Sequence, residues 1–213
     1  MLLSVSGATS RAGKTAAAVS LLRAVPGATA VQFTTTDDTF TGCPRGTPCV
    51  VCDIDVPFRL IEDPAVLRQP GTDTDRFAAA GASRVVWAIT KPVAAAAAWE
   101  AVQARFAGSP VVMEGSRVVA LARPDFTVFV AHPFLPPERW KPISAALIAS
   151  ADLVVVNRRS DERRQPSRSV LSALERHRKG RTTRIADVTL PLAEWAPEIL
   201  ARLLAAPAWP QVG

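Results

Sequence analysis

Several patterns are missing from this 213-residue sequence, and each absence excludes a class of protein. No run approaches the roughly 20 uncharged apolar residues of a membrane span, and no basic segment precedes the apolar start at Met1. Tyrosine is absent and the eight phenylalanines and five tryptophans are scattered, so no basic surface with aromatic rings for stacking single-stranded nucleic acid is indicated. We therefore expect a cytoplasmic protein that has no membrane partner and does not bind nucleic acid.

Histidine is scarce and the positive charge is unevenly distributed. His132 and His177 are the only histidines, and neither stands with a serine and an acid in the pattern of a nucleophile elbow, so serine-hydrolase chemistry is not indicated. The net charge is +6, but the basic excess lies between residues 158 and 184. A solvated arginine-rich face explains this local excess, and contact with an acidic partner or with product phosphates is the second interpretation.

Apolar runs alternate along the chain with helix-forming segments. Most of the runs are continuous rather than alternating, as in a parallel sheet that is covered on both faces. This order predicts an α/β fold, a three-layer sandwich around a mostly parallel, doubly wound sheet, in one domain over residues 1–213. Residues 35–74 lack a clear period, and we expect a loop insertion there and a surface loop at 160–168. The strands are predicted at residues 2–6, 30–34, 84–89, 111–114, 127–131, 152–156 and 183–188, and the helices at 15–24, 93–106, 143–150, 167–179 and 192–204.

A glycine-framed loop, ending in Gly-Lys-Thr, follows the first apolar run and precedes a helix-forming stretch. In such a loop successive backbone N–H groups surround phosphate oxygens at a helix N-terminus, the lysine adds a positive charge and the threonine hydroxyl ligates Mg²⁺. The sequence therefore predicts a P-loop NTPase that binds a nucleoside triphosphate with Mg²⁺. The residues predicted to contact the nucleotide in this loop are Gly7, Ala8, Thr9, Ser10, Arg11, Ala12, Gly13, Lys14, Thr15 and Ala16.

Acidic residues at the ends of two other apolar runs complete the predicted magnesium site. Glu114 ends the run 111–114, and Asp37 and Asp38 follow the run 30–34. Carboxylates at these ends bind Mg²⁺ or order a water molecule opposite a phosphate cradle. We predict Thr15, Asp37 and Glu114 as magnesium ligands, and Lys14, Asp38 and Glu114 as catalytic residues. For the two aspartates an ordinary role in a turn is the alternative.

A late apolar run ends in Asn157, which is followed by Arg158. An asparagine side chain offers both a donor and an acceptor to the edge of a purine, so we predict that these two residues contact the base. The guanine-selective pattern Asn-Lys-x-Asp is not reproduced, because arginine stands at the lysine position and Asp161 comes one residue late. GTP and ATP therefore both stay candidates.

All three cysteines, Cys43, Cys49 and Cys52, fall within one ten-residue stretch. In a reducing compartment such a cluster indicates metal ligation, as Zn²⁺ or an iron–sulfur cluster, with a fourth ligand from water, from Asp53 or Asp55, or from a second subunit. A redox-active pair and inert buried thiols are the alternatives.

Two stretches resemble known families. The glycine-framed loop, residues 7–16, is called the cradle below. Five residues separate its two glycines, a spacing similar to that of dethiobiotin synthetase and the cobyrinic acid amidases. Residues 69–82 read QPGTDTDRFAAAGA, which resembles the Pro-Gly-Lys-Asp-Thr/Ser-x-Arg-x-x-x-Ala-Gly-Ala signature of the molybdopterin-guanine dinucleotide biosynthesis protein B family. The order of motifs also resembles that family over residues 1–131, with Cys52-Asp53-Ile54-Asp55 before the signature and Met113-Glu114-Gly115 after it.

The resemblance implies a Mg²⁺-dependent GTP- or ATP-binding NTPase that is an accessory protein of molybdenum-cofactor guanylylation. It further implies a homodimer, a cofactor-biosynthesis enzyme as partner, and a role of Asp73 and Arg76 in responding to substrate or nucleotide. Two other functions stay open: an ATP-dependent kinase or ligase of the dethiobiotin synthetase type that acts on a small molecule, and a metal-cluster carrier in which nucleotide controls the cysteine loop.

Overall fold

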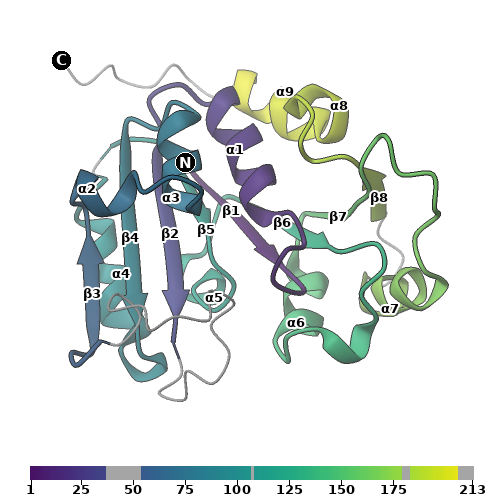
Figure 1. The fold of residues 1–213 in the computed structure, drawn as a ribbon, viewed down its shortest axis with the longest axis horizontal. Coiled ribbons are helices and arrows are strands. Elements are labelled where there is room, and N and C mark those ends of the chain that lie inside the picture. Colours follow the sequence, from purple (N-terminus) through teal and green to yellow (C-terminus); the bar gives the residue numbers. More distant parts are fainter. Residues whose placement is uncertain (37–53, 107, 179–182, 206–213) are drawn as a thin grey trace.

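The computed structural model describes residues 1–36, 54–106, 108–178 and 183–205, and its centre is one eight-stranded sheet (Figure 1). The strand order is β3-β4-β2-β5-β1-β6-β7-β8, and all neighbours are parallel except β3 and β4. The predicted α/β class with a mostly parallel sheet is confirmed. The strands are β1 (Leu2–Gly7), β2 (Thr29–Thr35), β3 (Phe58–Ile61), β4 (Arg84–Thr90), β5 (Val111–Glu114), β6 (Phe126–Ala131), β7 (Leu153–Asn157) and β8 (Thr183–Ala186).

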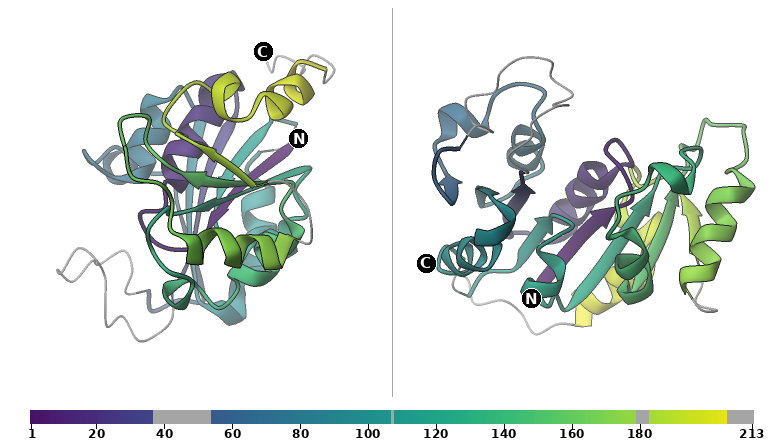
Figure 2. Two further views of the ribbon diagram at one scale, coloured as in Figure 1. Left: turned by 90° about the vertical axis from the view of Figure 1, so that its right-hand side faces the viewer. Right: turned by 90° about the horizontal axis from the view of Figure 1, so that it is seen from below.

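Helices cover both faces of the sheet, and the views in Figure 2 show α1 and α7 on opposite sides of it. One face carries α1, α3, α8 and α9, which bury Leu21, Phe77 and Trp195 against the strands. The other face carries α4 to α7, which bury Trp99, Ile148 and Leu174. The helices are α1 (Lys14–Ala24), α2 (Pro64–Leu67), α3 (Asp73–Ala79), α4 (Ala95–Gln103), α5 (Val119–Ala122), α6 (Ser144–Ser150), α7 (Arg168–Arg178), α8 (Leu192–Trp195) and α9 (Pro197–Ala205), with 3₁₀ turns η1 (Pro92–Ala94) and η2 (Pro137–Arg139).

The two-sided cover explains why the strands read as continuous apolar runs. Successive strand side chains point to opposite faces, so a strand with helices on both sides buries every residue. In β7, Leu153 and Val155 pack with the α1 side, whereas Val154 and Val156 pack with α6 and α7. The same division makes all four residues of β5 buried.

Two elements differ from the predictions. The segment 35–74 was predicted to be a loop, but β3, α2 and the start of α3 lie in its described part. β3 escapes recognition because it is a four-residue edge strand with exposed Arg59 in its middle. The predicted helix 192–204 is interrupted at Ala196, since Pro197 has no N–H to donate and disfavours helical geometry in the residue before it.

The chain changes direction in the sheet next to β1. After β1 it continues to β2 on one side, whereas after β6 it continues to β7 and β8 on the other side. In open α/β sheets such a point, outside the carboxyl ends of the strands, is where ligands bind. The loops that follow β1, β5, β6 and β7 all leave from this edge.

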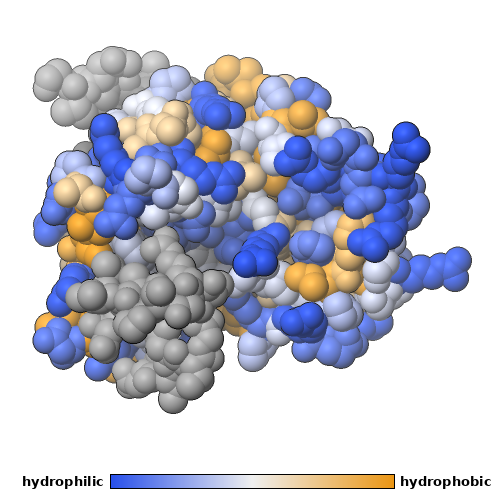
Figure 3. All heavy atoms as spheres, in the orientation of Figure 1, coloured by the Kyte–Doolittle hydropathy of each residue, from blue (hydrophilic) through white to orange (hydrophobic). Residues whose placement is uncertain are grey.

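The described surface gives no sign of a membrane-spanning segment. No helix within the described ranges is both long and apolar enough to cross a bilayer. The face in Figure 3 is mostly hydrophilic, with its hydrophobic residues in small separate patches. Exposed large apolar side chains in the described chain, such as Val93 and Leu204, are isolated residues of the kind that ordinary protein surfaces carry.

Candidate functional site

The loop between β1 and α1 is fixed at both ends by the strands and loops around it. The backbone N–H of Ala8 donates to the carbonyl oxygen of Val130 on β6 (3.1 Å), and the Ala8 carbonyl accepts from the N–H of Lys141 (2.9 Å). At the other end of the loop, Gly13 has φ 105° and ψ 14° and is the N-cap of α1. Its carbonyl oxygen accepts a hydrogen bond from the N–H of Ala17 in the first turn of the helix. The loop therefore turns sharply at the N-terminus of an eleven-residue helix.

Backbone donors gather in this turn. Residues 10 and 11 form a hydrogen-bonded turn, and none of the N–H groups of residues 9–11 and 13–16 donates to another residue in the part of the chain that the structure describes. The hydroxyl of Thr9, a residue only 8% exposed, is also buried without a hydrogen-bond partner there. Unpaired N–H groups at a helix N-terminus carry partial positive charge and bind anions.

Neighbouring atoms lie too close to the two framing glycines, Gly7 and Gly13, for either residue to carry a Cβ. A Cβ on Gly7 would lie 2.7 Å from the Val130 carbonyl oxygen and 2.8 Å from Cγ of Lys14. A Cβ on Gly13 would overlap the side-chain amide of Asn157, and its positive φ disfavours any other residue independently. The glycines thus let the loop pack against β6 and β7.

Glu114, at the carboxyl end of β5, joins the cradle to the neighbouring strand. Its Oε2 accepts a hydrogen bond from Oγ1 of Thr15 (2.9 Å), and its Oε1 lies 3.7 Å from Nζ of Lys14. The same ammonium group donates to the Thr9 carbonyl (3.3 Å). Burial raises the pKa of Glu114, and the charge of Asp73 raises it further, although Lys14, Thr15 and Lys141 act in the opposite direction. The predicted magnesium ligands Thr15 and Glu114 are therefore in direct contact.

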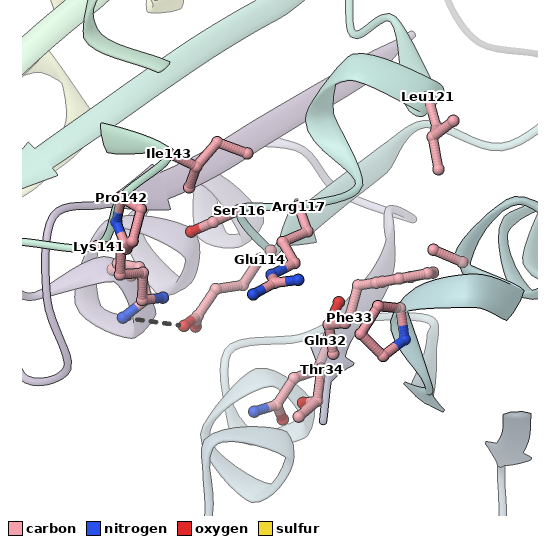
Figure 4. A pocket seen from close by; sticks show the side chains of 15 residues that line it. Gln32, Phe33, Thr34, Glu114, Ser116, Arg117, Leu121, Lys141, Pro142 and Ile143 are labelled. Atoms are coloured by element: carbon pink, nitrogen blue, oxygen red, sulfur yellow. Dashed lines mark ion pairs between the residues drawn. The ribbon is translucent and has the colours of Figure 1, made fainter. Parts of the chain in front are cut away.

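A cavity of about 840 Å³ extends from Lys14 and Glu114 along the carboxyl ends of β2 and β5 (Figure 4). Lys141, which no sequence motif indicated, lies in its wall on the segment between η2 and α6. Burial lowers the pKa of Lys141, as do the charges of Lys14 and Arg117, whereas Glu114 raises it. The lining residues are Lys14, Gln32, Phe33, Thr34, Thr35, Pro92, Ala95, Glu114, Gly115, Ser116, Arg117, Leu121, Lys141, Pro142 and Ile143.

Asn157, predicted to contact the base, connects the cradle to the segment after β8. Its Nδ2 donates to the Ala12 carbonyl (3.1 Å), and its Oδ1 accepts from the N–H of Val188 (3.3 Å). An amide has a second N–H and a second lone pair, so one donor and one acceptor are left for a ligand. Arg158 donates from Nη1 to Oε1 of Gln165 (3.1 Å). The contact of both residues with a base stays a prediction.

Three other residues considered from the sequence, His132, Asp73 and Arg76, lie outside the cradle. His132 Nδ1 accepts from the N–H of Phe134 (3.1 Å), and burial together with the charge of Arg164 lowers the pKa of His132. Asp73 opens α3, whose N-cap Thr72 accepts a hydrogen bond from the N–H of Asp75. Arg76 lines a separate hollow of about 230 Å³ beside α1.

Most of the remaining predicted site residues lie outside the described residues. These are the predicted metal ligands Asp37, Cys43, Cys49 and Cys52, the predicted catalytic residue Asp38 and the alternative fourth ligand Asp53. Asp55, the other alternative, is described, and its Oδ1 lies 3.5 Å from Nη2 of Arg59. Within the described ranges, no group of three or more histidine, cysteine, aspartate or glutamate side chains is placed to hold a metal ion. The predictions for the cysteine cluster and the aspartate pair stay predictions.

Comparison with known proteins adds no identification. No protein-family model matches the chain, and a search of curated proteins gives no significant match.

Proposed function

We propose that this protein is a Mg²⁺-dependent P-loop NTPase that binds GTP or ATP. One observation carries the proposal: the N–H groups of residues 9–11 and 13–16, which have no acceptor in the described chain, lie beside Lys14 and the partly buried Thr15–Glu114 pair at the edge where the sheet changes direction. An anion-binding turn, a cation and a carboxylate in one place match the needs of a bound magnesium–triphosphate.

The residues of the loop fit a triphosphate group. The N–H groups and the buried Thr9 hydroxyl are donors without a partner in the described chain, and phosphate oxygens are acceptors. Gly13 has no Cβ and a positive φ, so the backbone can make the sharp turn while the Asn157 side chain packs against it. Lys14, which now contacts Glu114 and the Thr9 carbonyl, supplies the positive charge that a phosphate requires.

Thr15 and Glu114 fit a magnesium ion. Mg²⁺ prefers oxygen ligands and takes one or two from the protein beside phosphate oxygens. A hydroxyl and a carboxylate oxygen 2.9 Å apart are such a pair, provided that Glu114 is ionised. When bound, the ion neutralises charge on the phosphate oxygens during hydrolysis. The chain's own contribution is to place the phosphates and to keep this carboxylate fixed and buried.

The stretch at residues 69–82 supports the more specific proposal of an accessory role in molybdenum-cofactor guanylylation, for which GTP would be preferred over ATP. A small-molecule kinase or ligase is the second candidate, because the cavity continues well beyond Glu114 to Phe33 and Leu121. Phosphorylated product would indicate the second candidate, whereas release of phosphate alone would indicate the first.

The deciding experiment is a titration with fluorescent GTP and ATP analogues, with and without Mg²⁺. We expect Lys14→Ala to lose affinity by at least about tenfold, because a charge-assisted hydrogen bond contributes about 1.5 to 3 kcal/mol. Arg68→Ala is the matched control, since Arg68 is exposed and lies outside both cavities. The proposal is contradicted if the wild type binds neither GTP nor ATP, or if Lys14→Ala binds nucleotide as tightly as the wild type.

A further inference from the structure

The cavity beyond Glu114 is mostly separate from the proposed phosphate cradle. Of its lining residues, only Lys14 and Glu114 belong to the cradle and its magnesium pair. The others come from the end of β2, from the segment after β5, from the start of the helical region at Pro92 and from residues 141–143. A volume of about 840 Å³ falls within the range of pockets that hold small organic ligands, roughly 300 to 1,000 Å³.

The charge of this cavity favours an anion. Lys14, Arg117 and Lys141 line it, against one carboxylate, Glu114, which already contacts Lys14 and Thr15. Lys141 is held in place through its backbone, because its N–H donates to the Ala8 carbonyl. Lys141 is an exposed residue, and partial desolvation together with the charges of Lys14 and Arg117 lowers the pKa of its ammonium group. Three cationic side chains in the wall, against one carboxylate that already has partners, favour an anionic ligand.

Ser116 gives an independent indication of a ligand. It lies in the cavity wall and is 8% exposed, and its hydroxyl is buried without a partner among the described residues. Figure 4 shows Ser116, Glu114, Arg117 and Lys141 on one side of the space, and Gln32, Phe33 and Thr34 opposite them. A buried hydroxyl left unpaired costs about 1 to 3 kcal/mol, and a ligand oxygen in the cavity would remove that cost.

We propose that this cavity is a second ligand site, for a small molecule that carries a carboxylate or phosphate group. The Lys141 ammonium contacts the oxyanion, the Ser116 hydroxyl donates a hydrogen bond to it, and Phe33 and Leu121 contact the apolar part of the molecule. The inference deepens the proposed function and rests on it, because the ligand would lie beside the bound nucleotide, next to Lys14 and Glu114.

The test measures binding of two simple probes, inorganic phosphate and succinate, by calorimetry while the cradle is saturated with Mg²⁺ and a non-hydrolysable nucleotide. We expect Lys141→Gln to weaken binding of at least one probe by about tenfold or more, and Lys141→Arg to restore it to within about threefold. Ser116→Ala should weaken it by about two- to tenfold. Arg68→Gln removes an exposed charge elsewhere and should bind like the wild type. Thermal unfolding confirms that each variant is folded, and Ser116→Ala alone decides if Lys141→Gln does not fold.

Two results would overturn the inference. One is unchanged binding of both probes to Lys141→Gln and Ser116→Ala. The other is a loss of nucleotide affinity in Lys141→Gln with probe binding intact, which would place Lys141 in the nucleotide site. A parallel titration without nucleotide, in Lys14→Ala, separates this inference from the proposed function. Probe binding that survives Lys14→Ala but is lost when Lys141→Gln is added supports the cavity site even if the wild type binds no nucleotide.

Discussion

Gly13 and Asn157 form a contact whose energy can be tested by a double-mutant cycle. Gly13 has a positive φ, and a Cβ at that position would overlap the Asn157 amide. That amide holds the cradle to β7 through the Ala12 carbonyl and to the segment after β8 through the Val188 N–H. Gly13→Ala should therefore act twice, by straining the backbone and by displacing the Asn157 side chain.

The magnitudes follow from these two effects. A residue with a Cβ in a left-handed conformation costs about 1 to 2 kcal/mol. Displacing Asn157 removes two hydrogen bonds, which contribute about 1 kcal/mol each. We expect destabilisation of about 3 to 4 kcal/mol for Gly13→Ala and about 2 kcal/mol for Asn157→Ala. The double variant should cost no more than Gly13→Ala alone, because the displaced side chain is already absent, which gives a coupling of about 2 kcal/mol.

Urea unfolding followed by tryptophan fluorescence measures the free energy of unfolding of each variant. Gly27→Ala is the matched control, since Gly27 also has a positive φ (77°) but no atom lies within 4 Å of its would-be Cβ. It should cost only the backbone strain and should add to Asn157→Ala without coupling. If the Gly13 double variant costs the sum of its singles, about 5 to 6 kcal/mol, the close approach of Gly13 to Asn157 does not hold.

Two further predictions concern pH. Burial raises the pKa of Glu114, and only the ionised carboxylate ligates Mg²⁺. Mg²⁺-dependent nucleotide affinity should therefore fall as pH decreases through that raised pKa. Nucleotide titrations between about pH 8 and pH 5 measure this fall, which Glu114→Gln should abolish. Burial alone would raise the pKa of Asp187, but hydrogen bonds from Thr189 and from the Ser160 N–H outweigh it and, with Arg159, lower the pKa. The stability that ionised Asp187 contributes is present above the unfolded pKa of about 3.9 and is lost as pH falls through the lowered folded pKa. Urea unfolding below about pH 5 should show this loss of stability in the wild type. An equal acid dependence in Asp187→Asn would contradict the prediction.

The sequence predicted those features that depend on contiguous residues. The apolar runs indicated the parallel strands because helices on both faces bury every side chain of a strand such as β7. Both Thr15 and Glu114 were selected from local patterns, and the structure brings them to 2.9 Å across 99 positions of sequence. Their function as magnesium ligands stays a prediction.

Features that depend on the packing of distant segments could not be predicted. β3 joins the sheet through backbone pairing with β4, which its short, charge-interrupted sequence does not indicate. Lys141 lies in a proline-rich stretch without any motif, and its N–H donates to the Ala8 carbonyl beside the cradle. Asn157 was selected as a base contact, but its bonds to Ala12 and Val188 depend on the adjacency of β1, β6, β7 and β8.

The sequence by itself determined an α/β chain with a glycine-framed turn before its first helix, because periodic burial and backbone freedom are properties of neighbouring residues. Only the tertiary structure decided that Glu114, Lys141 and Asn157 contact that turn and that Ser116 lines the cavity beside it. Their positions follow from the order of the strands in the sheet, which is set by the packing of both faces at once.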